Sequence, residues 1–468
     1  MPSRLRKFIG TRAFYAMVLT LVIPIIVQNA ISNFVNLLDN LMVGRIGTDQ
    51  MSGVAIANQL MFVFNITIFG AVSGAGIFAA QYHGAGNTEG VRAAFRYKLY
   101  IGLFLTCAAV ILFLTKGEQL ISLYLTDTSD PARVRSTLDF GMQYLRIMVA
   151  GLLPFALTQS YAGTLRETGE TSLPMYAGVV AVSVNLIFNY LLIFGKFGLP
   201  KLGVQGAAIA TVLSRYVELA IIIVCAHRNK KRYPFAHGLY RTLKIPLPIV
   251  REITIKGMPL LVNELLWSMS TATTNQIYSM RGLDIIAAMN IFSTIYNLFG
   301  VAYLSMGSAA SIIVGQALGS NDIETSKDYA RKLLTLSFFV GLTVGICLAI
   351  ASPFIPLLYN TSSTVHSLST KIILVSSVFM CLHSYVHTSY FIIRSGGKTG
   401  ITFLFDCVFS WLVVIPVAFC LVRFTSFNIV KVYLGVQFTE ILKFIIGTLL
   451  VVKGVWINNI VSDEKMQA

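Results

Sequence analysis

Long apolar stretches alternate with short polar segments along the chain. A helix needs about 20 largely apolar residues to cross the hydrocarbon core of a bilayer, and about twelve stretches approach that length. They lie near residues 14–38, 51–80, 97–115, 138–163, 172–195, 203–226, 257–280, 285–315, 333–358, 372–394, 400–422 and 429–452. The pattern predicts an all-α polytopic membrane protein with about twelve transmembrane helices.

The residues that fix bends and loops repeat along the chain. A shift of 235 residues places Pro24 on Pro259 and Gly47 on Gly282 without a gap. The same shift relates Asp49, Gln81, Gly84, Glu89 and Arg96 to Asp284, Gln316, Gly319, Glu324 and Arg331. Equal spacings of this kind indicate an internal duplication.

The duplication predicts two six-helix lobes: an N-lobe in residues 1–226 and a C-lobe in residues 257–468. An even number of spans gives both copies the same orientation, so a pseudo-two-fold axis should run along the membrane normal. The intervening segment, residues 227–256, is basic and contains three prolines. We expect this linker to be a flexible tether that lets the lobes move.

Composition and charge agree with a membrane location. Of the 468 residues, 55% are hydrophobic and 12% are charged, with a mean hydropathy of +0.73 and a net charge of +16. A soluble domain would have about a quarter of its residues charged. Basic residues crowd ahead of the first span and in the linker, which places both termini and the linker in the cytoplasm, for a multi-pass protein of the cell membrane.

The expected partners follow from the same distribution. Because the basic residues are scattered over loops, with no aromatic-interleaved patch, we expect contact with the lipid bilayer and no nucleic acid. The six cysteines lie in or beside apolar spans without CxxC spacing, so packing is favoured over disulfides or zinc. No metal or cofactor is predicted from them.

One face of the first predicted helix is polar. Gln28, Ser32, Asn36 and Asp39 follow one another at spacings of four, four and three residues. Such a stripe is too costly to face lipid, so it should face protein or water. Pro24 removes a backbone hydrogen bond from the same helix and makes a bend plausible.

Asp39 breaks the internal symmetry, because the 235-residue shift places it on Thr274. A carboxylate held away from water can exchange a proton near neutral pH, so Asp39 is a candidate ion-coupling residue. The alternative is an acid at the membrane interface, at the end of the helix.

A second polar group is expected in the fifth and sixth spans. Asn185 and Asn189 are four residues apart and share a helical face, and Thr211 follows in the next span. Their oxygens, with the Asp39 carboxylate, could accept a monovalent cation such as Na⁺. The alternative is structural hydrogen bonding between helices.

The second half has acids of its own. Glu264 has no basic residue within a helical turn, and an unpaired intramembrane acid is a functional candidate. Asp406 lies in the eleventh span. Glu440 and Lys443 are spaced for a local ion pair, which favours a structural role for both.

Histidine and aromatic side chains add weaker candidates for a substrate-binding cleft. His383 and His387 are four residues apart, without an HExxH pattern or a third zinc ligand. They are interpreted as a polar helix contact or as a titratable pair. Trp267 and Tyr385 could present aromatic faces to a cationic substrate. Gln28, Asn36, Glu264 and Asp406 are further candidates for the cleft.

Several motifs, in order, resemble those of the multidrug and toxic compound extrusion (MATE) transporters. They are Asp39 to Gly47 (DNLMVGRIG), Leu165 to Thr171 (LRETGET), Leu202 to Thr211 (LGVQGAAIAT) and, in the second half, Ile393 to Thr399 (IRSGGKT). The second and fourth motifs are 228 residues apart, so loop lengths differ between the halves. The resemblance covers essentially the whole chain.

The resemblance implies a twelve-helix, two-lobe antiporter that exports organic cations against H⁺ or Na⁺, without a cofactor. Asp39 matches the family's coupling carboxylate and Pro24 the proline that bends the first helix. Asn185 and Thr211 match oxygens of the N-lobe cation site. Asn189 stands where one branch of the family has an aspartate. The absence of that charge favours H⁺ over Na⁺ as the coupling ion. Glu264 is similar to the helix-seven acid of the sodium-coupled branch.

We expect the protein to be a monomer, and two other interpretations of its function remain open. A flippase of lipid-linked saccharide precursors would share the overall design, but few Arg or Lys residues lie inside the spans to bind a pyrophosphate. A membrane-embedded enzyme would need catalytic motifs, and the sequence contains no HExxH, GxSxG or paired-aspartate motif.

Overall fold

The computed structural model describes residues 8–125, 130–359 and 361–462, and these residues form helices and connecting turns without a strand. Eleven helical segments among them are long and apolar enough to cross a membrane. The twelfth predicted span lies in α8 (Leu247–Ser279), a 33-residue helix. Asn263, Glu264 and several Ser and Thr residues lie inside this predicted span and lower its hydropathy. The prediction of an all-α polytopic membrane protein is confirmed.

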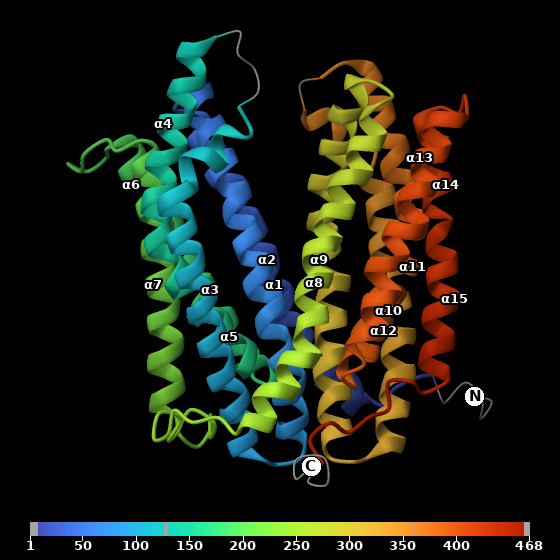
Figure 1. The fold of residues 1–468 in the computed structure, drawn as a ribbon. Helices are drawn as coiled ribbons and strands as arrows, with labels where there is room; N and C mark the ends of the chain where they lie inside the picture. The colour runs from blue at the N-terminus through green and yellow to red at the C-terminus, as the bar shows by residue number, and fades with distance from the viewer. Residues whose placement is uncertain (1–7, 126–129, 360, 463–468) are drawn as a thin grey trace. The chain divides into compact units, whose positions relative to one another are not determined.

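The described residues of the first half form seven α-helices (Figure 1). They are α1 (Arg12–Gly44), α2 (Thr48–Gly84), α3 (Thr88–Ser122), α4 (Pro131–Met148), α5 (Leu152–Glu167), α6 (Ser172–Phe194) and α7 (Val204–Arg228), with a 3₁₀ turn at Val149–Gly151 between α4 and α5. Local signals set their ends. The side chain of Asp130 caps α4 ahead of Pro131, and Gly195 ends α6 in the left-handed conformation.

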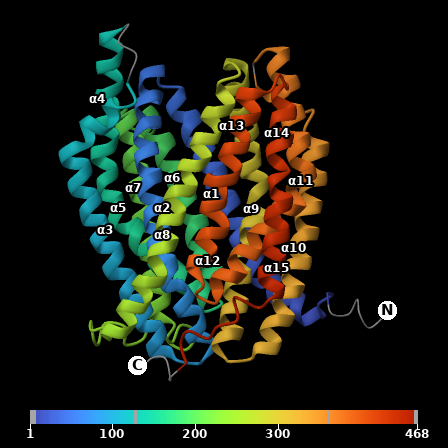
Figure 2. The ribbon, with the colours of Figure 1, turned by 45° about the vertical axis from the view of Figure 1, so that its right-hand side comes forward.

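The second half begins with α8 and continues in the same manner. Its other elements are α9 (Leu283–Gly319), α10 (Ile323–Ala351), a 3₁₀ turn (Pro356–Leu358), α11 (Ser363–Ser395), α12 (Thr399–Phe403), two π-helical segments (Leu404–Val408 and Ser410–Val414), α13 (Ile415–Phe424), α14 (Ile429–Gln437) and α15 (Thr439–Val452). Figures 1 and 2 show α12 and α13 continuing along one rod, and α14 and α15 along another.

The helix boundaries reproduce the sequence duplication. The first helix of each half has 33 residues, and α8 begins and ends 235 positions after α1. The second helix of each half has 37 residues, and α9 follows α2 at the same offset. Because two helices of each half keep their length and spacing, the repeated prolines and glycines occupy equivalent places in the fold.

The chain divides into two compact units, each described by itself. One comprises Met1–Ile26, Ala80–Asn87 and Thr254–Ala468, and the other comprises Val27–Ala79 and Thr88–Ile253. The boundary in α1 therefore falls two residues after Pro24. The predicted lobes, 1–226 and 257–468, are inferred from the internal repeat and not from packing contacts. They stay a prediction.

In the second of these units the linker packs along α3. Arg92 Nε donates to Phe235 O at 3.2 Å, Arg96 Nε to Leu239 O at 3.1 Å, and Tyr100 Oη to Leu243 O at 2.8 Å. The donors follow one another at single-turn spacing on α3, and the side chains of Phe235 and Leu239 are buried. These hydrogen bonds hold this part of the linker along α3, and its role as a tether between the lobes stays a prediction.

In the first unit the last turn of α2 packs closely against the last turn of α9. A Cβ atom on Gly84 would lie 1.9 Å from Gln316 O, and a Cβ atom on Gly319 would lie 1.9 Å from Gln81 O. The two contacts are equivalent under the 235-residue repeat. Only glycine lets the two backbones come this close.

The side chain of Gln81 links the segment after α15 to this pair of helix ends by hydrogen bonds. Gln81 is fully buried. Its Nε2 donates to Ser395 O at 2.9 Å and to Asn458 O at 3.2 Å, and its Oε1 accepts from Ile460 N at 2.8 Å. One repeated glutamine therefore links three distant parts of the chain.

Candidate functional site

Asp39 lies in a cluster of amide and hydroxyl groups from α6 and α7. Its Oδ1 accepts a hydrogen bond from Asn189 Nδ2 at 2.6 Å. The same Nδ2 donates to Asn185 Oδ1 at 3.0 Å, and Asn185 Nδ2 lies 3.2 Å from Thr211 Oγ1. The structure thus brings together the four residues that the sequence singles out as ion-coupling candidates.

The amide of Asn185 satisfies more partners when it is turned over. In that orientation its nitrogen donates to both carboxylate oxygens of Asp39, at 3.0 and 3.2 Å, and its oxygen accepts from Thr211 Oγ1 at 3.2 Å. Nitrogen and oxygen of an amide are assigned from such networks. The Asp39 carboxylate is then held by neutral donors from two asparagines.

The neighbouring helices fix these positions. Asn185 and Asn189 stand one turn apart on α6, which packs along α7, and Thr211 Oγ1 donates to Ala207 O at 3.0 Å. Asn189 Oδ1 is buried without a partner among the described residues. This oxygen, with the half-buried Asp39 carboxylate, forms an acceptor-rich site of the kind that suits a proton or a small cation.

Tyr144 belongs to this cluster although the sequence gives no sign of it. Its side chain is 5% exposed, and its hydroxyl is within hydrogen-bonding reach of Thr211 and Asn58. Tyr144 lies on α4, where aromatic residues in apolar spans are too common to mark a site. Only the packing of α4 on α7 reveals it.

The other candidates of the first helix are spread along α1. Pro24 lies inside the helix, which continues on both sides of it. Gln28 Oε1 accepts from Arg166 Nη1 at 3.5 Å, a long contact with α5. The side chain of Asn36 lies outside the part of the chain that the structure describes.

Asp406 anchors a second buried cluster, in the other unit. Its Oδ1 accepts from Lys443 Nζ at 2.8 Å and its Oδ2 from Asn263 Nδ2 at 3.1 Å. Lys443 therefore pairs with Asp406, and not with Glu440 as the spacing on the sequence favours. The acid of α15 instead lies 3.6 Å from His383 Nδ1. Packing between helices decides the pairing.

Two further candidates lie near this second cluster. Glu264 is within electrostatic range of Asp406 and Arg394. His387 is within range of the same two groups, and its ring packs edge-on against Tyr303, with the ring centroids 5.6 Å apart.

The remaining candidates for the substrate cleft are His383, Tyr385 and Trp267. His383 Nε2 is 2.9 Å from Gln437 Oε1. Tyr385 Oη accepts from Thr448 Oγ1 at 3.1 Å, and its ring packs against Phe444, with centroids 4.6 Å apart. Trp267 is 44% exposed. The structure does not bring Trp267 or Tyr385 to either carboxylate through a hydrogen bond or an ion pair.

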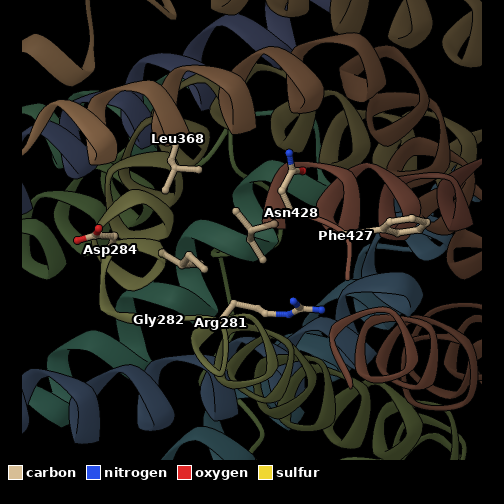
Figure 3. A pocket seen from close by; sticks show the side chains of 8 residues that line it. Arg281, Gly282, Asp284, Leu368, Phe427 and Asn428 are labelled. Carbon is tan, nitrogen blue, oxygen red and sulfur yellow. The ribbon is translucent and has the colours of Figure 1, made fainter. Parts of the chain in front are cut away.

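A pocket of about 500 Å³ lies elsewhere, at the turn between α8 and α9 (Figure 3). Arg281 Nη2 donates to Val422 O at 2.6 Å, which caps the end of α13. In Figure 3 the carboxylate of Asp284 points away from that guanidinium. None of the predicted site residues lines this pocket. Across the described residues, no three His, Cys, Asp or Glu side chains gather as metal ligands would.

Duplicated apolar helices with partly buried carboxylates in both packed units are typical of a polytopic membrane transporter. The MatE family model matches residues 24–191 and 259–420, and the chain belongs to this family, the MATE transporters. The two matched segments begin at the equivalent prolines of the duplication. The predicted resemblance is confirmed, and family membership makes the protein a transporter and not an enzyme.

Relatives match along nearly their whole length. The chain is 24% identical to "Probable multidrug resistance protein NorM" of Thermotoga maritima, over 93% of this chain and 92% of that one. It is 26% identical to "Probable multidrug resistance protein YoeA" of Bacillus subtilis, over 88% of each. A solved multidrug resistance MATE transporter in an outward-facing conformation shares the fold, with a TM-score of 0.85, 19% identity and coverage of 97% and 98%.

Proposed function

We propose that this protein is an antiporter that exports organic, mostly cationic compounds in exchange for H⁺ or Na⁺ by alternating access. The observation that carries the proposal is the cluster of Asp39, Asn185, Asn189 and Thr211. A buried carboxylate that is held by neutral hydrogen-bond donors can be neutralised by a proton or a cation from outside. That exchange is the chemical step that an antiporter needs.

Neutralisation of Asp39 changes the forces on α1. The ionised carboxylate accepts charge-assisted hydrogen bonds from the amides of α6, and these weaken when the charge is lost. Pro24, on the same helix, lacks a backbone donor, so α1 can bend there at low energetic cost. Ion binding can drive the bend only to the extent that the ion binds the two conformations differently.

The chemistry of the cluster favours H⁺ over Na⁺. Asp39 is its only carboxylate, since position 189 is an asparagine. Affinity for a hard cation grows with the number of charged ligands, so a single carboxylate makes a weak sodium site. A proton needs one carboxylate and no further ligands.

The relatives and the distribution of charge support the rest of the proposal. NorM and YoeA are named as probable multidrug resistance proteins, so we infer small organic molecules as substrates of this chain. The basic linker and the basic N-terminal segment support a cytoplasmic location for both termini. Each lobe carries its own buried carboxylate, so a monomer suffices for the proposed cycle.

Efflux of ethidium from energised proteoliposomes tests the proposal. Asp39→Asn should abolish efflux driven by an imposed pH gradient while leaving membrane insertion intact. Asp139→Asn makes the same chemical change at an exposed site on α4 and should keep the rate of the parent protein. Full efflux by Asp39→Asn would overturn the role of this carboxylate. Adding and removing Na⁺ at fixed pH separates the two coupling ions.

A further inference from the structure

Lys443 places an ammonium group on a buried carboxylate of another helix. The side chain of Lys443 is 9% exposed and that of Asp406 is 20% exposed, and their charged atoms lie 2.8 Å apart. This distance is typical of a charge-assisted hydrogen bond. The carboxylate therefore already has a cation, and that cation is part of the chain.

The surroundings suit an ammonium better than a bare metal ion. Nζ of Lys443 lies 5.8 Å from the ring centroid of Phe405 and 5.6 Å from that of Phe409. Aromatic faces attract ammonium groups, but they offer no oxygen to a metal ion. Phe405 and Asp406 lie in the first π-helical segment of this span and Phe409 lies between the two segments; this backbone form is often found at functional sites.

The other oxygen of the carboxylate accepts a hydrogen bond from a neutral amide. Asn263 Nδ2 donates to Asp406 Oδ2 at 3.1 Å and lies 3.3 Å from Tyr390 Oη. Asn263 is 2% exposed, and its Oδ1 has no partner among the described residues. An unpaired acceptor beside a carboxylate marks a site for positive charge.

Stability alone does not account for such a pair. Replacing a buried ion pair by well-packed apolar residues is often neutral or stabilising, whereas removing one partner is strongly destabilising. Glu264 and His387 are within electrostatic range of Asp406, Glu440 is within range of Lys443, and Arg394 is within range of Glu264 and His387.

We propose that Lys443 is a tethered counter-ion, whose ammonium fills the cation position of the Asp406 site and excludes Na⁺ from it. The ion-binding part of this proposal rests only on the contacts of Lys443 and Asn263 with Asp406. Its consequence for transport rests on the proposed antiport: inorganic cations then exchange at the Asp39 cluster and not at Asp406.

Truncation of the lysine tests the ion-binding part. Lys443→Ala in purified full-length protein in nanodiscs should lower Tm by several degrees, because Asp406 loses its partner. Propylammonium, which replaces the missing atoms, should restore much of that loss, and NaCl should restore a smaller part. Choline chloride at equal ionic strength should restore none, since its bulky headgroup does not fit the space.

The matched control is the double variant Asp406→Asn/Lys443→Ala, which lacks both charges. It should respond equally to propylammonium, Na⁺ and choline. An equal response of Lys443→Ala to all three salts, or the same selective response in the double variant, overturns the proposal. If Lys443→Ala does not accumulate, Lys443→Gln replaces it. The Tm of Lys443→Gln should rise with Na⁺, whereas the Tm of the parent should not.

Transport is measured separately so that the two proposals can fail independently. With H⁺ as the coupling ion that the Asp39 cluster favours, efflux by the parent should not change when Na⁺ replaces choline at fixed pH. Efflux by Lys443→Gln should become dependent on Na⁺. Absence of efflux by the parent under any ion gradient refutes antiport, whereas the Tm measurement still tests the role of Lys443. Normal parent efflux with no Na⁺ response in Lys443→Gln refutes the tethered counter-ion.

Discussion

Replacing Gly319 by alanine should separate the ends of α2 and α9. The new Cβ would lie 1.9 Å from Gln81 O, whereas nonbonded heavy atoms are optimally about 3.5–4.0 Å apart. Because the obstacle is a backbone carbonyl and not a flexible side chain, no change of rotamer relieves the clash. The two helix ends must therefore move apart by roughly 1.5 Å or more.

The energetic effect follows from this overlap. Forcing an extra methyl group into a well-packed contact costs about 1–3 kcal/mol. In alternating access, a conformation in which these ends separate does not suffer this penalty. The ratio of separated to closed conformations should then rise by roughly 5–150-fold. Gly84→Ala meets the equivalent obstacle, Gln316 O at 1.9 Å, and should act in the same direction.

Spin labels at Ala85 and Ser320, on a cysteine-free background, measure the separation directly. Gly319→Ala should broaden or lengthen the distance distribution and lower the Tm. The control is Gly102→Ala on α3, where a Cβ would meet nothing closer than 3.7 Å. A distance distribution and Tm for Gly319→Ala that match those of the control would refute the reasoning.

Three other substitutions test contacts inside the units. Gln81→Ala removes three hydrogen bonds of a fully buried side chain, each worth about 0.5–1.5 kcal/mol, so its Tm should fall well below that of the exposed control Gln119→Ala; equal Tm values would contradict this. Glu167→Gln leaves the fully buried ammonium of Lys98 without its carboxylate, which should destabilise the protein by about 3–5 kcal/mol in a denaturant titration. Lys98→Met/Glu167→Gln should recover part of that loss, and no recovery would count against the pairing. Asn189→Asp adds a second carboxylate to the N-terminal cluster and should make efflux stimulated by Na⁺; unchanged dependence on Na⁺ would show that charge count does not limit sodium binding there.

The sequence predicts the helices well because the signals are local and repeated. Apolar length identifies the spans, and the 235-residue repeat matches α8 to α1 and α9 to α2 residue by residue. What the sequence does not reveal is non-local. The docking of Phe235 and Leu239 along α3 depends on hydrogen-bond donors 143 residues earlier in the chain. The sequence of the linker does not indicate these donors.

The two carboxylate sites also differ in how far local sequence signals predict them. Asp39, Asn185 and Asn189 can be grouped in advance because their helical spacings, together with family motifs, indicate a shared face. The partner of Asp406 cannot, because Lys443 has a nearer acid at the right spacing on its own helix. Only the packing of α15 against the π-helical span shows which acid receives the ammonium.

The asymmetry between the two sites has a consequence for energy coupling. Asp39 is held by neutral amides, so each neutralisation there must bring one positive charge from solution. Asp406 is compensated by Lys443 and takes up none. A cycle with a single exchangeable site would trade one monovalent substrate for one monovalent ion and move no net charge. The membrane potential, worth about 2.3 kcal/mol per charge for each 100 mV, would then contribute nothing, and the chemical gradient of the ion would be the whole driving force. The duplicated scaffold therefore allows the two halves to differ in charge balance, and in the proposed antiport Lys443 would limit the exchange to one ion for each substrate.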